Sequence, residues 1–272
     1  MFRKWFTSLA VAALSVLCLG YSPTQGETIV SANFSSYTNG ALVGQNGWQQ
    51  YQTQTSLPLT VSGGAVSWVG GSTVNNQDAF LAFPQQYNQP AVGDPTQILN
   101  FDILLSITAA PSLNPSYFAA LNTLTTSSTT NNFQNARLVA QASGSGYVFG
   151  ARVNGQGGYP FAYGTDVLDF GVDYALRAEI HMVAGNANDF INLYVGPDFN
   201  NLTLYATAAY GSGTVSDPSF GAMLISQFGS ASVGEPGVSI KSMSVSAVPE
   251  PTSAGLLALT GIVGMALRRR RS

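Results

Sequence analysis

Three ionisable side chains on one predicted strand are the strongest acid–base candidates in this sequence. Between Tyr174 and Val183, apolar residues alternate with polar ones, so a period of two places Arg177, Glu179 and His181 together on one face. A glutamate and a histidine two positions apart on one face could transfer a proton to or from a substrate. The competing interpretation, a charged row on a solvated sheet face, is the one that we favour.

The common catalytic constellations are missing from the sequence. His181 is the only histidine, which excludes a multi-histidine zinc centre, and there is no Gly-x-Ser-x-Gly elbow for a nucleophilic serine. The four glutamates are too dispersed for the paired carboxylates that a retaining glycosidase places on one strand. We therefore expect a protein that is not an enzyme. A secreted polysaccharide-acting enzyme that uses Glu179, His181 or the segment 166–173 remains the alternative.

Three aspartates in a glycine-bearing segment are the only metal candidates. Asp166, Asp169 and Asp173 carry oxygen ligands of the kind that Ca²⁺ prefers, although their spacing matches no EF-hand. Aspartate is also a common turn residue, and this is the favoured interpretation. No cofactor is expected, with a calcium-dependent lectin as an alternative.

Charge is scarce and unevenly distributed along the chain. Charged residues make up only 8% of the 272 residues, and six of the ten basic residues lie at the two ends. The stretch 27–247 retains four basic residues against twelve acidic ones, a net charge of about −8. A nucleic-acid partner is disfavoured on this ground and none is expected, because neutralising phosphates requires a clustered basic surface.

The N-terminus has the order of a secretory signal peptide. Arg3 and Lys4 precede the apolar run from Leu9 to Leu19, and a stretch of small and polar residues follows it. Cys18, the only cysteine, lies within this run, so the exported protein would contain no disulfide. We expect residues 1–26 to be removed on export, with cleavage after Ser22 or Gly26.

The C-terminus carries the most specific motif in the chain. Pro249, Glu250 and Pro251 are followed by an apolar run from Ala254 to Leu267. The chain then ends in an arginine cluster of Arg268, Arg269, Arg270 and Arg271 before Ser272. Arginines after an apolar run stay in the cytoplasm, which predicts a short transmembrane helix with the rest of the chain outside the inner membrane.

This order of proline motif, apolar helix and arginine cluster resembles the PEP-CTERM sorting signal of exported bacterial proteins. The resemblance covers only residues 248–272, and it implies recognition and cleavage by an exosortase, a membrane transpeptidase-like enzyme. It also implies release to the cell surface or to an extracellular polysaccharide matrix. A permanent membrane anchor is the alternative, because the physical properties of the segment suit both fates.

The stretch between these two ends reads as one all-β domain, residues 27–247. Short alternating runs are broken by Gly, Asn, Pro and Ser, with no long helical period. About a dozen strands over this length favour a two-sheet jelly-roll β-sandwich. The predicted strands are Leu57 to Val61, Ala65 to Val69, Gln97 to Thr108, Tyr117 to Leu121, Ala136 to Ala142, Gly146 to Val153, Tyr174 to Val183, Phe190 to Val195, Leu202 to Ala208, Ser219 to Ser226 and Val238 to Ala247.

Several short segments of this body resemble the concanavalin-A-like and laminin-G-like sandwiches. They are Phe34 to Gly40, Gly44 to Trp48, Leu193 to Pro197 and the closing strand Val238 to Ala247. The resemblance implies a curved sandwich whose concave face holds a glycan in the carbohydrate-binding relatives. Trp48 would then be a candidate sugar-stacking side chain, although a core or edge aromatic is the favoured interpretation of this residue. Arg177, Glu179 and His181 would be the candidate polar ligand face.

These observations together predict an exported, non-catalytic β-sandwich protein of the cell envelope or exopolysaccharide matrix. Its expected partners are an exosortase-like processing enzyme, the inner membrane through the tail, and an extracellular polysaccharide that it contacts weakly.

Overall fold

The computed structural model describes residues 26–51, 57–70, 77–112, 114–123, 134–153, 161–185, 188–209, 218–227 and 234–248. Thr28–Ala247 form one compact unit. Residues 1–25 of the predicted signal peptide and the sorting tail from Pro249 onward lie outside the described residues, as does the polar segment 125–132. Within the described ranges, no helix is long and apolar enough to cross a membrane.

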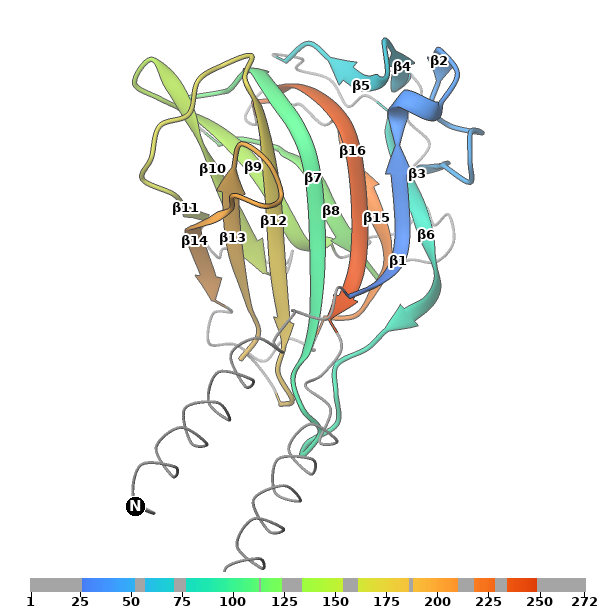
Figure 1. Ribbon diagram of the computed structural model, residues 1–272, viewed down its shortest axis with the longest axis vertical. Helices are drawn as coiled ribbons and strands as arrows, with labels where there is room; N and C mark the ends of the chain where they lie inside the picture. The colour runs from blue at the N-terminus through green and yellow to red at the C-terminus, as the bar shows by residue number, and fades with distance from the viewer. Residues whose placement is uncertain are drawn as a thin grey trace, which may run out of the picture. The chain divides into compact units, whose positions relative to one another are not determined.

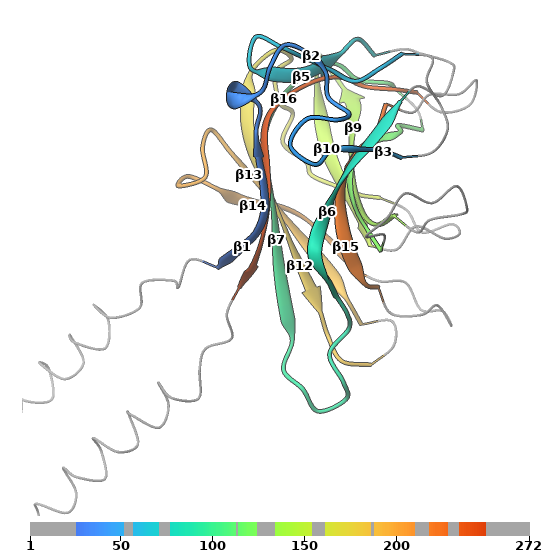
Figure 2. The same cartoon turned by 90° about the vertical axis from the view of Figure 1, so that its right-hand side faces the viewer.

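Two antiparallel sheets face each other and confirm the predicted all-β sandwich (Figures 1 and 2). The nine-stranded sheet, called sheet A below, has the order β14-β13-β12-β7-β16-β5-β4-β2, and β1 also pairs with β16. Its strands are β1 (Glu27–Asn33), β2 (Gly40–Ala41), β4 (Thr60–Ser62), β5 (Ala65–Trp68), β7 (Gln97–Ala109), β12 (Asp173–Met182), β13 (Phe190–Gly196), β14 (Thr203–Ala209) and β16 (Gly237–Val248).

The seven-stranded sheet, called sheet B below, has the order β11-β10-β9-β8-β15-β6-β3. Its strands are β3 (Gln49–Tyr51), β6 (Asp78–Tyr87), β8 (Tyr117–Asn122), β9 (Gln134–Ser143), β10 (Gly146–Val153), β11 (Ala162–Tyr163) and β15 (Phe220–Ile225). A short 3₁₀ helix, η1 (Phe34–Ser36), follows β1. Sheet B lies behind sheet A in Figure 1 and to the right of it in Figure 2.

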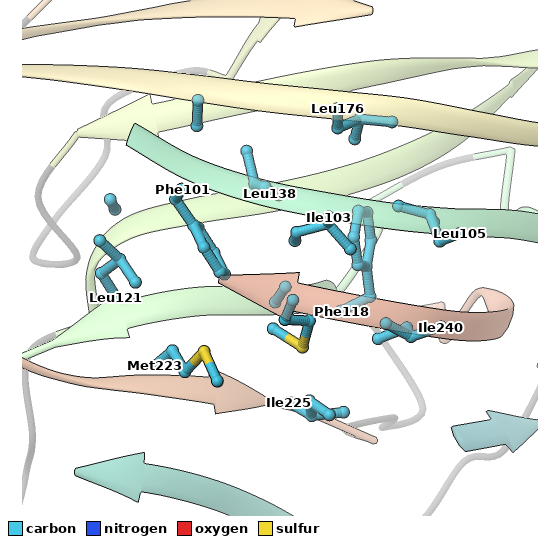
Figure 3. Close-up of a cluster of buried hydrophobic side chains, with 14 of the residues drawn as sticks. Phe101, Ile103, Leu105, Phe118, Leu121, Leu138, Leu176, Met223, Ile225 and Ile240 are labelled. Atoms are coloured by element: carbon cyan, nitrogen blue, oxygen red, sulfur yellow. The ribbon is translucent and has the colours of Figure 1, made fainter. Parts of the chain in front are cut away.

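The main core fills the space between the sheets (Figure 3). Phe101, Ile103 and Leu105 point inward from β7 and are fully buried. They meet Phe118 of β8 and Met223 of β15 from the opposite sheet. Alternate residues of each strand supply this core, as period-two patterning requires.

Two of the predicted strands, Leu57 to Val61 and Ala65 to Val69, correspond to β4 and β5, which form a hairpin around Gly63 and Gly64. Val61 pairs with Val66 and Ser62 with Ala65 across a two-residue turn. Gly63 and Gly64 have φ values of 59° and 82°, the left-handed region that glycine enters without steric cost. Glycine is therefore required at this turn.

The other predicted strands are confirmed to within a few residues, but β6 was missed. Its first half, Ala79–Phe83, is an apolar run without alternation, and Pro84 follows it. The run lacks the period-two signal because side chains on both faces of the strand are buried. The short strands β2, β3 and β11 and the N-terminal strand β1 were also not predicted.

Candidate functional site

The alternation predicted for the strand from Tyr174 is confirmed in β12. Leu176, Ala178, Ile180 and Met182 are buried in the core, while Arg177, Glu179 and His181 lie on the outer face of sheet A, partly exposed. Arg177 donates two hydrogen bonds to Asp102 of β7, at 2.7 and 2.8 Å. This hydrogen bond raises the pKa of Arg177, so the pair is a stable ion pair on the sheet face.

Glu179 and His181 form a hydrogen bond with each other on this face. The His181 Nε2 lies 2.6 Å from the Glu179 Oε1, and the imidazole stacks on Phe190 at 4.1 Å between ring centroids. The hydrogen bond to His181 lowers the pKa of Glu179. The geometry brings the predicted acid–base pair together, but each group already has a partner. Its role in contacting a ligand stays a prediction.

Trp48 is not a sugar-stacking platform. Only 1% of its surface is exposed, and its ring packs against Phe34 at 6.0 Å between centroids. Its indole Nε1 donates to the Tyr37 hydroxyl at 3.3 Å. These contacts fit the favoured interpretation of Trp48 as a core aromatic, because the segment after β2 folds back over η1 and buries the ring.

The three aspartates proposed as calcium ligands do not converge. Across the described parts of the chain, no group of three acidic, histidine or cysteine side chains could hold a metal ion. Asp173 pairs with Lys241, and Asp166 accepts from the Tyr205 hydroxyl through its backbone carbonyl. The Asp169 backbone N–H donates to the Tyr174 hydroxyl at 3.3 Å. The turn-forming interpretation of this segment fits these contacts.

A second set of residues, which the sequence did not reveal, gathers on the outer face of sheet B. Every second residue of its strands points away from the core, and the strand registers align these residues into transverse rows. One row runs across Gln49, Phe80, Leu224, Ala120, Arg137 and Arg152. The neighbouring row contains Tyr51, Asp78, Tyr117, Val139, Gly150 and Tyr163.

One end of this face, near β3 and β6, is a small buried cluster with acidic groups. Tyr51, Phe80 and Leu224 are fully buried there, in a cluster separate from the main core. Asp78 is 4% exposed and Glu235, just before β16, is 2% exposed. The two carboxyl groups come from positions 157 residues apart in the sequence.

Asp78 is affected by both its burial and its acidic neighbour. Burial raises the pKa of Asp78 to about 7, and the nearby charge of Glu235 adds to this rise. The backbone N–H of Gln227 donates to the Asp78 Oδ1 at 2.8 Å and opposes the rise. A perturbed buried carboxyl group beside a second one is a common property of functional sites.

The other end of the face, near β9 and β10, carries half-buried arginines and aromatic rings. The Arg137 guanidinium lies over the Tyr117 ring at 4.9 Å, and that of Arg152 lies over Phe161 at 4.6 Å. Burial raises the pKa of Tyr117, and the charge of Asp78 adds to this rise, which links the two ends of the face. We call Tyr117, Arg137, Arg152, Phe161 and Tyr163 the arginine–aromatic patch.

Three polar atoms at the middle and acidic end of the face are buried without a hydrogen bond in the described part of the structure. They are Asn122 Nδ2, Ser226 Oγ and Gln227 Oε1. Ser226 is near enough to lower the pKa of both Asp78 and Tyr117, yet its hydroxyl makes no hydrogen bond of normal geometry. Buried polar groups usually have a partner. The outer face of sheet A has such an atom too, the Oδ1 of Asn100 opposite Glu179, so this observation does not separate the two faces.

The sequence offered little that could have identified this face. Its residues come from all seven strands of sheet B and from segments between strands, so no local spacing connects them. The one available signal was that Arg137 and Arg152 are two of only four basic residues in the body.

No protein-family model and no curated protein matches the chain. Among solved structures, the chain is similar to the CBM2 module of the evolved Dit protein from Lactobacillus casei BL23 phage J-1. The two are 13% identical over 84% of this chain and 99% of that chain, with a TM-score of 0.45. It is also similar to the carbohydrate recognition domain of Emp47p, at 12% identity, 84% and 99% coverage and a TM-score of 0.42.

A third similar structure is a bifunctional GH43-CE protein from Bacteroides eggerthii. It is 12% identical over 80% of this chain and 26% of that chain, with a TM-score of 0.46. All three TM-scores are below 0.5, so no ligand or activity of these proteins is transferred to this chain.

Proposed function

We propose that this protein is an exported, non-catalytic glycan-binding β-sandwich that uses the outer face of sheet B. The observation that carries the proposal is the arginine–aromatic patch, in which rings and hydrogen-bond donors lie half-buried side by side. Sugars are bound by this combination, because a ring face packs against C–H groups while polar side chains pair with hydroxyl groups.

Burial supports binding rather than cleavage. Asp78 and Glu235 are 4% and 2% exposed, so neither carboxyl group reaches a glycosidic bond on the surface. The patch, in contrast, is partly exposed at Tyr117, Arg137 and Arg152. A bound sugar would therefore contact the patch and lie beyond the reach of the two acids.

A polysaccharide-acting enzyme is the second candidate, and it would require a glycan to reach the buried Asp78 and Glu235. A carboxyl group with a pKa of about 7 next to another acid could act as a general acid at neutral pH. Incubating the protein with a polysaccharide panel and measuring new reducing ends distinguishes the two. We expect no product. Product release that Asp78→Asn abolishes would replace the binding proposal.

Binding is tested with the purified full-length protein in a mild non-ionic detergent on a panel of polysaccharides. We expect at least one glycan to bind, and Tyr163→Ala to weaken this binding about tenfold. Tyr194→Ala is the matched control, because Tyr194 lies in the Arg177 row on sheet A. If Tyr194→Ala loses binding and Tyr163→Ala does not, the ligand face is sheet A.

Export and sorting through the C-terminal tail are part of the same proposal. Their support is the order of the segments in the sequence: a signal peptide before the body, and the proline motif, apolar run and arginine cluster after it. A glycan-binding body released outside the inner membrane would contact the exopolysaccharide there.

A further inference from the structure

The ring of Tyr163 lies over a glycine on the outer face of sheet B. Tyr163, in the edge strand β11, pairs directly with Gly150 of β10, so the two positions share a face. A Cβ atom added to Gly150 would lie 2.7 Å from both Cδ1 and Cε1 of the Tyr163 ring, well inside van der Waals contact. The ring therefore occupies the space that a side chain at position 150 would fill.

Backbone conformation does not explain this glycine. Gly150 is not one of the glycines with a positive φ, so the strand geometry there would accept other residues. Glycine in the interior of a strand weakens the strand, and it often marks a place where another group approaches the backbone closely. At Gly150 the approaching group is the Tyr163 ring.

The residue after Tyr163 fixes the end of β11. The Gly164 N–H donates to the Phe149 carbonyl at 3.1 Å. The ring of Tyr205, from β14 of sheet A, packs against Gly164, where an added Cβ would lie 2.0 Å from a ring atom. The Tyr205 hydroxyl also donates to the Asp166 carbonyl. A ring on a strand held in this way loses little conformational freedom when a ligand binds.

Tyr163 and Phe161 together form an aromatic surface that a ligand can reach. Both side chains are partly exposed, and their ring centroids lie 6.1 Å apart. Because β10 supports one side of the Tyr163 ring, the exposed part of this ring is available for packing against a sugar.

Building on the function proposed above, we infer that the glycan stacks on Tyr163, that Gly150 is the positioning residue for this ring, and that the preferred glycan has equatorial β-linkages. In such a glycan, axial C–H groups give each pyranose ring a flat apolar face. An axial α-linkage places an oxygen on that face and interrupts it. A ring held against the sheet therefore selects the β-linked form.

The test compares oligosaccharides that differ only in the configuration of their linkages. The full-length protein is titrated with cellohexaose and maltohexaose, which are β-1,4- and α-1,4-linked glucose, and with the corresponding β-1,3 and α-1,3 hexasaccharides. A polyoxyethylene detergent is used, because an alkyl maltoside would itself offer a sugar. We expect at least one β-linked member to bind about tenfold more tightly than its α-linked counterpart.

Variants at position 163 connect this preference to the ring. Tyr163→Phe should keep the preference, because stacking uses the ring and not the hydroxyl group, whereas Tyr163→Ala should remove most of it. Tyr194→Ala on sheet A should leave it unchanged. A preference that survives in a folded Tyr163→Ala protein refutes the stacking role of this residue.

Gly150→Ala tests the positioning role, because the added Cβ must displace the ring. We expect it to reduce the preference, and to have no further effect in a protein that already carries Tyr163→Ala. If Gly150→Ala alone does not fold, the double variant should fold, since its ring is gone. An unchanged preference in Gly150→Ala, or an equal loss of folding in both, refutes this role.

The remaining outcomes separate this inference from the proposed function. Equal affinities within each pair, or tighter binding of the α-linked members, refute the linkage preference while glycan binding stands. If none of the four oligosaccharides binds but another glycan of the panel does, an equatorial β-linkage in that glycan supports the inference and an axial α-linkage refutes it. If no glycan of the panel binds, this inference and the proposed function are both wrong.

Discussion

At the scale of single residues, the charged side chains on the outer faces of the two sheets have different partners and different burial. On sheet A, Arg177, Glu179 and His181 satisfy one another or an adjacent side chain within hydrogen-bonding distance. On sheet B, Asp78 is buried near Glu235, and Arg137 is opposite Arg152. A buried carboxyl group with a raised pKa is often found near functional sites, and this supports the proposal that ligand binding uses sheet B.

Asp78 should make stability fall as the pH rises. Its pKa is raised from 3.8 to about 7 in the folded protein, so between these values the folded state keeps a proton that the unfolded chain has lost. Stability therefore decreases with pH across this window, by at most about 4 kcal/mol. Asp78→Asn stays neutral, and its Oδ1 can still accept from the Gln227 N–H.

We expect the Tm of Asp78→Asn to exceed that of the wild type at pH 8 and to converge with it near pH 4. Thermal melts across this range measure the difference. Asp94→Asn makes the same change on an exposed turn and serves as the control. If the Asp78→Asn and wild-type curves run parallel, the carboxyl group is not buried as described.

Trp48 should matter for stability and not for ligand binding. Trp48→Ala removes a fully buried ring that packs on Phe34, which should lower the free energy of unfolding by about 3–5 kcal/mol. Urea unfolding measures this loss, and Trp48→Phe should recover part of it. A folded Trp48→Ala protein that no longer binds glycan would restore the sugar-platform interpretation.

At the scale of secondary-structure elements, β8, β9 and β10 form the floor of the candidate site. The pairing of β8 with β9 shifts register between Tyr117 and Ala119, where an extra residue bulges out. This shift places Phe118 and Ala119 both toward the core and brings Tyr117 to the outer face, under Arg137. The bulge thus orients an aromatic residue of the patch.

The turn between β13 and β14 should depend on a single glycine. A Cβ atom added to Gly196 would lie 1.9 Å from the backbone oxygen of Asn201, far inside van der Waals contact. Gly196→Ala must therefore displace the turn, and we expect a loss of roughly 1–3 kcal/mol in denaturant unfolding. Asn200→Ala, an exposed change in the same turn, should cost little. Equal stability of the two variants would contradict this packing.

At the scale of the whole molecule, the proposal depends on where the chain is delivered. The few charges of the body, 27–247, are mostly acidic, while the basic residues concentrate at the two ends that we interpret as export and sorting signals. In the proposed function, the body binds the glycan and the two ends direct its delivery. A body with a net charge of about −8 would remain in solution once the tail is removed.

Processing of the tail is tested by the intact mass of the protein isolated from its host, with membrane-bound and released material separated. We expect a released species that begins near Glu27 and ends between Val248 and Pro251. Replacing Pro249 and Pro251 by alanine should prevent cleavage. A species in the inner membrane that still carries Arg268 to Arg271 would instead indicate a permanent anchor.

The sequence by itself determined the fold class, most strands and the two faces of β12, because these follow from local periodicity and from turn residues such as Gly63 and Gly64. The same local signal failed for β6, whose two buried faces remove the alternation. The candidate site was decided only by tertiary structure. Asp78 and Glu235, 157 residues apart, and Arg137 and Arg152, on separate strands, meet only through strand register, and register depends on which face each strand buries.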